Sequence, residues 1–190
     1  VIILVTARPG LLLPTIRSRC RVVKFYAMAR PDLEKSLMSR TFEGQGISAS
    51  QAHFLAYYSE GSLGIALRLK DHGLFDEKNR IIDLFCGIGT QADDPVSLAS
   101  RQDLLVSFNV LASWFRDIYL LKSGAPAGDL VHSDRMDDLA RDASRYSLRD
   151  LDRVVEALSE SALNVSRNLN KKLLVSNVIT ACRQSLTAFA

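Results

Sequence analysis

Apolar residues recur at helical spacing along most of the chain from residue 28 onward, and this periodicity constrains the fold more than any other feature. The segment 148–163 carries the clearest stripe, which consists of Leu151, Val154, Val155, Leu158, Ala162 and Leu163. The segment 98–122 carries a second stripe, which consists of Leu104, Phe108, Leu111, Ala112, Phe115, Ile118 and Tyr119. One-sided helices are stable only when their apolar stripes pack against one another. The sequence therefore predicts a helical bundle over residues 96–190, with further helices near 134–143 and 168–188.

Helix start and stop signals divide residues 28–72 into three short helices. Pro31 suits the first turn of a helix, Gly61 suits a left-handed helix end, and Ser62 suits an N-cap. A break follows at 71–73, and residues 73–95 are predicted as a helical linker that ends in a segment rich in Gly and Asp. The pattern indicates a compact three-helix unit, a linker and a larger C-terminal bundle.

Composition excludes several classes of protein. A net charge of +3 over 190 residues is too small to argue for nucleic-acid binding. Cys20, Cys86 and Cys182 are far apart and the three histidines are scattered, so we expect neither a disulfide framework nor a metal site. The continuous apolar runs are far shorter than the roughly 20 residues that span a bilayer. We expect a cytoplasmic protein without a membrane segment.

Two apolar segments near the N-terminus have the composition of β-strands. Val1–Val5 is apolar on both faces, as is typical of a central strand in a parallel sheet, and Cys20–Phe25 is rich in β-branched residues. Too little further strand signal follows to complete a sheet. The sequence therefore predicts two residual strands in a mainly α-helical chain, and we expect the chain to be the C-terminal portion of a longer protein.

Between these segments lies Thr15-Ile16-Arg17-Ser18-Arg19-Cys20, and Thr6 follows the first of them. The arrangement resembles the end of the AAA+ ATPase domain in the clamp-loader family. The resemblance implies that residues 1–27 are the remnant of such a domain, that 28–72 form its three-helix lid, and that 96–190 form a collar that holds subunits in a ring. It implies that Arg19 is an arginine finger that acts on ATP in a neighbouring subunit. Thr6 would occupy the sensor-1 position, in vestigial form.

Glu60–Leu67 is the second stretch that carries the resemblance. In ATP-hydrolysing motor subunits of the family (gamma/tau), a similar segment supplies the sensor-2 arginine, but here Gly64 occupies that place. The departure indicates similarity to the delta-prime subunits of bacterial DNA polymerase III, which implies that the chain binds no cofactor itself. ATP and Mg²⁺ would lie in the neighbouring subunit. The implied partners are the motor and delta subunits, and through the assembled complex the sliding clamp and primed DNA.

Three alternatives remain open at this point. Arg19 could belong to a solvated basic cluster with Arg17 and Arg21. The chain could be part of a motor subunit, although Gly64 argues against that interpretation. It could also be an unrelated helical nucleic-acid-binding or scaffold protein, although acidic residues interleaved through 134–160 argue against a continuous basic face. Cys20 is expected to be a small buried residue, and Trp114 an aromatic of the core or of an interface between subunits.

Overall fold

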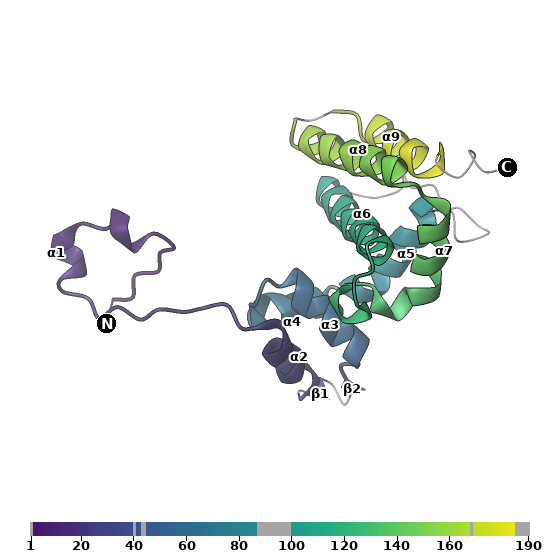
Figure 1. Ribbon diagram of the computed structural model, residues 1–190. Helices are drawn as coiled ribbons and strands as arrows, with labels where there is room; N and C mark the ends of the chain where they lie inside the picture. Colours follow the sequence, from purple (N-terminus) through teal and green to yellow (C-terminus); the bar gives the residue numbers. More distant parts are fainter. Residues whose placement is uncertain (1, 40, 43–44, 87–99, 168, 185–190) are drawn as a thin grey trace.

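The structure is a computed structural model that describes residues 2–39, 41–42, 45–86, 100–167 and 169–184, and it is mainly helical (Figure 1). An N-terminal segment runs apart from a helical body (Figure 1). This segment contains a 3-10 turn at Pro9–Leu11 and a single helical turn, α1, at Pro14–Arg17. The body begins at residue 28, where the helical periodicity of the sequence begins.

The first three helices of the body confirm the helices predicted for residues 28–72. They are α2 (Arg30–Met38), α3 (Ala49–Tyr58) and α4 (Leu63–Asp71). A two-stranded antiparallel hairpin, β1 (Thr41–Phe42) and β2 (Gln45–Gly46), connects α2 to α3. The hairpin was not predicted, because two residues per strand give no alternating pattern.

Local caps explain why these helices begin where they do. The Ser48 hydroxyl accepts a hydrogen bond from the Gln51 backbone N–H, and the Ser62 hydroxyl accepts one from Ile65 N–H. Gly61 has a φ of 82°, and a Cβ on it would approach the Met28 carbonyl oxygen to 2.7 Å. Because the Gly61 carbonyl also accepts a hydrogen bond from Met28 N–H at 2.9 Å, glycine is required where the N-terminal segment joins the body.

The C-terminal part of the body contains five longer helices: α5 (Leu74–Cys86), α6 (Arg101–Lys122), α7 (Met136–Arg145), α8 (Leu148–Ser166) and α9 (Lys171–Gln184). Capping boxes start α6 at Ser100 with Asp103 and α8 at Ser147 with Asp150. Helix α6 packs against α5, α7 and α8, and α9 packs against α8 and α5. The predicted helical bundle is therefore present, with α6 at its centre.

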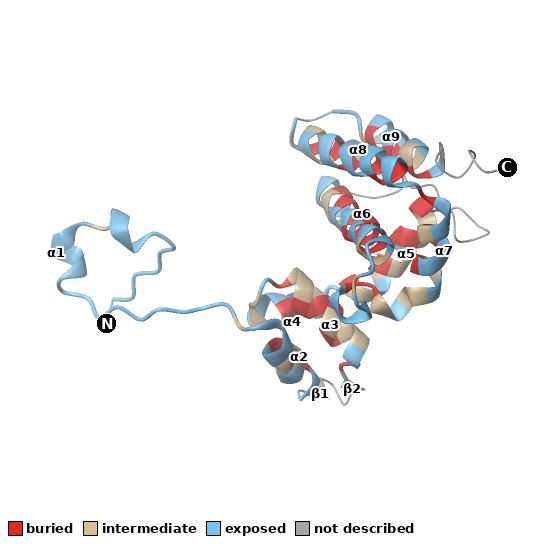
Figure 2. Cartoon of the chain, in the orientation of Figure 1, coloured by how far each residue is buried: buried red, intermediate tan, exposed pale blue. Residues whose placement is uncertain are grey.

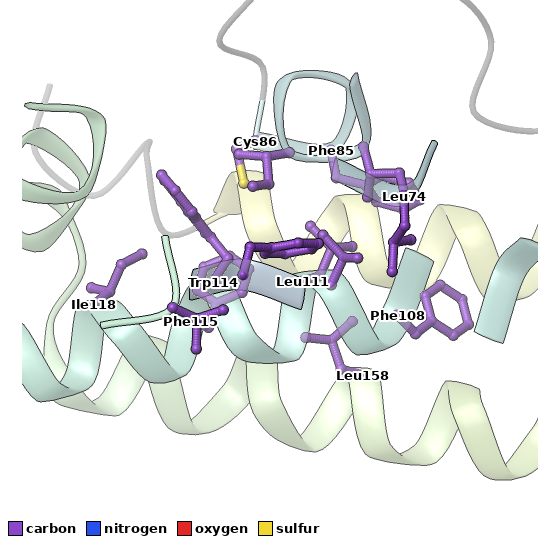
Figure 3. Close-up of a cluster of buried hydrophobic side chains, with 14 of the residues drawn as sticks. Leu74, Phe85, Cys86, Phe108, Leu111, Trp114, Phe115, Ile118 and Leu158 are labelled. Carbon is purple, nitrogen blue, oxygen red and sulfur yellow. The ribbon is translucent and has the colours of Figure 1, made fainter. Parts of the chain in front are cut away.

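The core of the bundle surrounds α6 (Figure 3). Phe108, Leu111, Trp114, Phe115 and Ile118 on α6 are at most 1% exposed. In Figure 3 they meet side chains from α5 and, at Leu158, from α8. The prediction that Trp114 is a core aromatic is confirmed.

Several apolar residues assigned to the stripes are exposed. On α8, Leu151, Val154 and Leu158 are buried, but Val155 is 43% and Leu163 is 63% exposed. The stripe was drawn too wide, because successive helical residues are rotated by about 100° and only a narrow arc of α8 meets its neighbours. Tyr119 on α6 is likewise 42% exposed.

The two residual strands are a wrong prediction. Residues 2–5 and 21–25 have no strand structure, and Ile2, Val5 and Phe25 are more than 89% exposed. A strand needs a hydrogen-bonded partner, and neither segment pairs with another within the described residues. Cys20, expected to be buried, is exposed for the same reason. Val1 lies outside the described residues.

Some predictions fall partly outside the described residues. These include the Gly- and Asp-rich end of the predicted linker at 87–95 and the helical continuation beyond residue 184. The part of the predicted linker that is described belongs to α5, which begins at Leu74 and packs against α4, α6 and α9. The domain boundaries at 27, 72 and 95 stay predictions.

Helix α6 is long and apolar enough to cross a membrane, by length and composition alone. Its most apolar window is 56% buried inside the protein, against the helices around it. A core helix with neighbours on three sides meets the same criterion as a membrane span. The apolarity of α6 is therefore accounted for by packing.

The register of α8 predicts different costs for two leucines on the same helix. Leu158→Ala should lower the free energy of unfolding by about 2–5 kcal/mol, because Leu158 is 2% exposed and its loss leaves a cavity beside α6. Leu163→Ala, on the outward side, should change it by less than about 1 kcal/mol. Urea unfolding followed by circular dichroism measures both. Equal losses would contradict this register.

Candidate functional site

The segment predicted to carry the arginine finger forms one helical turn at the surface. Pro14 begins α1, and the Ser18 hydroxyl donates to the Thr15 carbonyl oxygen at 3.2 Å. The Arg19 guanidinium donates to the same carbonyl oxygen at 3.3 Å, and Arg19 is exposed. Within the described residues no acidic side chain forms an ion pair with Arg19. A planar guanidinium has five N–H donors, so one weak bond to its own turn leaves it able to bind an anion.

Thr6 and Gly64 lie in separate parts of the molecule. The Thr6 hydroxyl accepts a hydrogen bond from Arg8 N–H at 3.0 Å, which is a local turn contact. Gly64 is the second residue of α4 and is exposed, with no atom within 4 Å of where a Cβ would lie. Figure 1 shows α1 apart from α4, so the structure does not bring Arg19 and Gly64 together. Sequence reasoning had assigned them to different nucleotides, so their separation neither supports nor opposes those roles.

A polar cluster that sequence reasoning missed lies between α3, α6 and the segment after Leu130. The Ser113 hydroxyl donates to the Val110 carbonyl oxygen at 2.7 Å and so can only accept from its other neighbours, Tyr58 and His132. His132 Nε2 lies 2.8 Å from that hydroxyl and must donate, while His132 Nδ1 is buried without a partner among the described residues. Burial lowers the pKa of His132 well below its usual value. His132 is therefore a neutral, structural histidine.

Asp117 supports the same segment from α6. Its carboxylate is fully buried and accepts a hydrogen bond from His132 N–H at 2.8 Å, and Arg116 lies 3.2 Å from its other oxygen. Burial raises the pKa of Asp117 to about 6, although the bond from His132 and the charge of Arg116 act in the opposite direction. The carboxylate fixes where the chain turns between α6 and α7.

A buried lysine ties α5 to the same segment. Lys78 is 0% exposed, and its ammonium donates to both carboxylate oxygens of Asp134 at 2.6 and 2.8 Å. The ammonium also lies 4.6 Å from the centre of the Phe75 ring. Burial lowers the pKa of Lys78, and the bond to Asp134 opposes that effect. Arg135 adds bonds to Asp83 on α5 at 2.7 Å and to Asp138 on α7 at 2.6 Å.

His53 on α3 links the first three helices to the C-terminal part of the body. Its Nδ1 lies 2.9 Å from the Glu34 carboxylate, and its Nε2 lies 2.8 Å from the Leu130 carbonyl oxygen. Both oxygens only accept, so both bonds form together only when each ring nitrogen carries a hydrogen. The partners are 19 and 77 residues away in sequence, and no sequence pattern brings them together.

The chemistry available in these clusters is structural. Within the described residues, no group of three or more His, Cys, Asp or Glu side chains is placed to hold a metal ion. The Cys86 thiol is buried, and burial raises its pKa well above the usual value, so it is not an activated nucleophile. The residues that face solvent in a form suited to a partner are those of the Arg19 turn and of the outer helices.

Comparison with known protein families gives the identity of the C-terminal helices. The family described as "DNA polymerase III, delta subunit, C terminal" matches residues 90–184, which include all of α6, α7, α8 and α9. This is half of the chain. The chain belongs to this DNA polymerase III delta family.

Membership of this family places the chain among the clamp-loader subunits of DNA polymerase III. The match covers the predicted collar helices but does not reach the Arg19 turn, Thr6 or Gly64. No curated protein and no solved structure matches the chain. In this clamp-loader protein, α6 is the central helix of the family's domain, and the His53 link attaches the preceding three helices to it.

The His53 link predicts that α3 depends on this side chain for its attachment. His53→Ala should lower the free energy of unfolding by about 1–3 kcal/mol, because it removes two hydrogen bonds and leaves the Leu130 carbonyl without its partner. His72→Ala, at an exposed helix end, should change it by less than about 0.5 kcal/mol. Chemical denaturation measures both values. Equal effects of the two substitutions would show that the link does not stabilise the fold.

Burial of Asp117 predicts a pH dependence of stability. The folded-state pKa, about 6, lies above the usual 3.8, so the protonated form favours the fold. This contribution is fully present below about pH 4 and is lost as the pH rises through about 6, and it amounts to up to about 3 kcal/mol. The stability of the wild type relative to Asp117→Asn should therefore fall over this range. Exposed Asp129→Asn serves as the control, and parallel wild-type and Asp117→Asn curves would contradict the assignment.

Proposed function

We propose that the chain is a delta-prime-like subunit of the bacterial DNA polymerase III clamp loader, in which Arg19 completes the ATP site of a neighbouring motor subunit. The observation that carries the proposal is the family match over α6–α9. The Thr15–Cys20 motif supports the finer assignment, as does the exposed Arg19 guanidinium, which forms no ion pair within the described residues. In this role the C-terminal helices join the loader ring, and the protein works in the cytoplasm without a nucleotide of its own.

The physical basis of the finger is the shape and charge of arginine. The guanidinium stays ionised and forms two parallel hydrogen bonds to oxygens of a transferring phosphoryl group. Fingers of this kind are worth about 10³–10⁵ in turnover in other nucleotide hydrolases. An arginine that acts in trans has to project from its own subunit, and Arg19 projects from a surface turn. ATP and Mg²⁺ would be held by the neighbour.

Gly64 favours the delta-prime-like role over the motor role. The first turn of α4 presents no charged side chain at this position, and a glycine cannot donate to a phosphate from a side chain. Arg68 is one helical turn further along α4 and projects from a different level of the helix. The proposed assembly therefore pairs this chain with motor and delta subunits, a sliding clamp and primed DNA.

The finger is tested by ATP turnover of the complete loader with clamp and primed DNA. Arg19→Ala should remove a large share of the stimulated turnover while gel filtration shows intact assembly. Arg19→Lys should fail in the same way, because it keeps the charge but loses the planar fork. Arg17→Ala, on the same exposed turn, is the matched control and should retain turnover. Unchanged turnover in Arg19→Ala would overturn the finger and leave a purely structural role in the ring.

A further inference from the structure

We infer that the outer faces of α8 and α9 carry opposite charges and bind one another between two copies of the chain, head to tail. The inference rests on the proposed function for its setting, because a loader ring needs each subunit to offer two different faces. It adds which faces these are and what chemistry joins them. Figure 2 shows that the sides of α8 and α9 that face away from the body are exposed.

The acidic face of α8 consists of Asp152, Glu156 and Glu160. These residues are four apart, so they lie on one side of the helix along about 12 Å. All three are exposed, and none forms an ion pair within the described residues. Arg153, on the same helix, is engaged with Asp150 at 3.5 Å. Leu163 continues this side of α8 and is 63% exposed.

The basic face of α9 consists of Lys172 and Arg183. They are eleven residues apart, which places them on one side of the helix at a spacing of about 16 Å. Both are exposed, and so are Ser176 and Thr180 between them. Leu173 beside this face is 64% exposed. The sequence from residue 161 to residue 190 contains no Asp or Glu, so the basic face has no acidic neighbour on its own helix.

The two faces do not neutralise each other within one chain. Helices α8 and α9 pack together through Leu158, Val175 and other buried side chains, and no ion pair joins the acidic face to the basic face among the described residues. The faces differ in chemistry, so a contact between them is heterologous, and such contacts build rings or open chains rather than two-fold dimers. Opposite charges set the orientation of the contact, and the exposed leucines supply apolar area.

Charge complementarity identifies a second copy as the occupant. The acidic face needs a partner helix with basic residues spread along about 16 Å and small residues between them, and α9 presents that pattern. The contact is small and its charges are exposed. Association of the isolated chain should therefore be weak and should fall as salt rises from about 0.1 M to about 1 M, where the Debye length shrinks from about 10 Å to about 3 Å.

A charge-swap experiment tests the inference. One variant, D152K/E156K/E160K, has two basic faces, and the other, K172E/R183E, has two acidic faces. Each alone should associate at least about tenfold more weakly than the wild type in sedimentation velocity, because like charges then meet. An equal mixture should associate again, since the unchanged basic face of the first variant meets the unchanged acidic face of the second, and the reversed faces also match. The control K35E/R68E, on α2 and α4, should behave as the wild type.

Three outcomes would overturn the inference. They are a wild-type chain that stays monomeric at about 1 mM protein in about 0.1 M salt, swap variants that associate as the wild type does, and a mixture that fails to recover. Circular dichroism of each variant shows that it is folded, so loss of association reports the interface. The Arg19 turnover measurement uses the complete loader. Failed self-association with finger-dependent turnover retained therefore overturns this inference alone.

Discussion

The structure depends on the burial of α6. This 22-residue helix contacts α5, α7 and α8, and its largest apolar side chains are almost completely removed from water. Each fully buried side chain of this size contributes about 1.5–3 kcal/mol of favourable transfer free energy, so a single helix with many such residues organises the rest. The neighbouring helices take their orientation from it. The family match covers this helix and the three that follow, and so the matched unit and the packed unit coincide.

Polar groups define how the first three helices attach to that core. Asp117 and Ser113 project from α6 itself, and they hold the backbone and side chain of His132 in the segment after Leu130. His53 on α3 then reaches the Leu130 carbonyl oxygen. Burial makes each of these groups costly to leave unpaired, so the arrangement has few alternatives. A helix packed only through leucines could slide, whereas these bonds fix one position for α3 relative to α6.

The helices were predictable from sequence because their signals are local. Ser48, Ser62 and Ser147 lie next to the helices they cap, and the apolar spacing of α6 and α8 repeats within a few turns. The polar cluster was not predictable, because Lys78 meets Asp134 across 56 residues and His53 meets Leu130 across 77. The exposure of Val155 and Leu163 was missed because the width of a buried arc depends on neighbours that the sequence does not identify. The strand assignment failed because a strand is defined by its partner, and Cys20–Phe25 meets none among the described residues.

The contrast between the N-terminal segment and the body bears on how the proposed finger would work. The body is held by buried aromatic rings and by charged groups with short bonds, whereas residues 2–26 are almost entirely exposed and include Val22, Val23 and Phe25. Apolar side chains of this kind are stable when another surface covers them. Arg19 lies within this segment, so whatever covers the apolar residues also determines where the guanidinium points. A finger that has to meet a phosphate within hydrogen-bonding distance needs such positioning from outside its own turn, because the single bond to Thr15 cannot provide it. The rigid body and the exposed segment thus divide the proposed role, with assembly assigned to α6–α9 and contact with the neighbour's nucleotide assigned to Arg19.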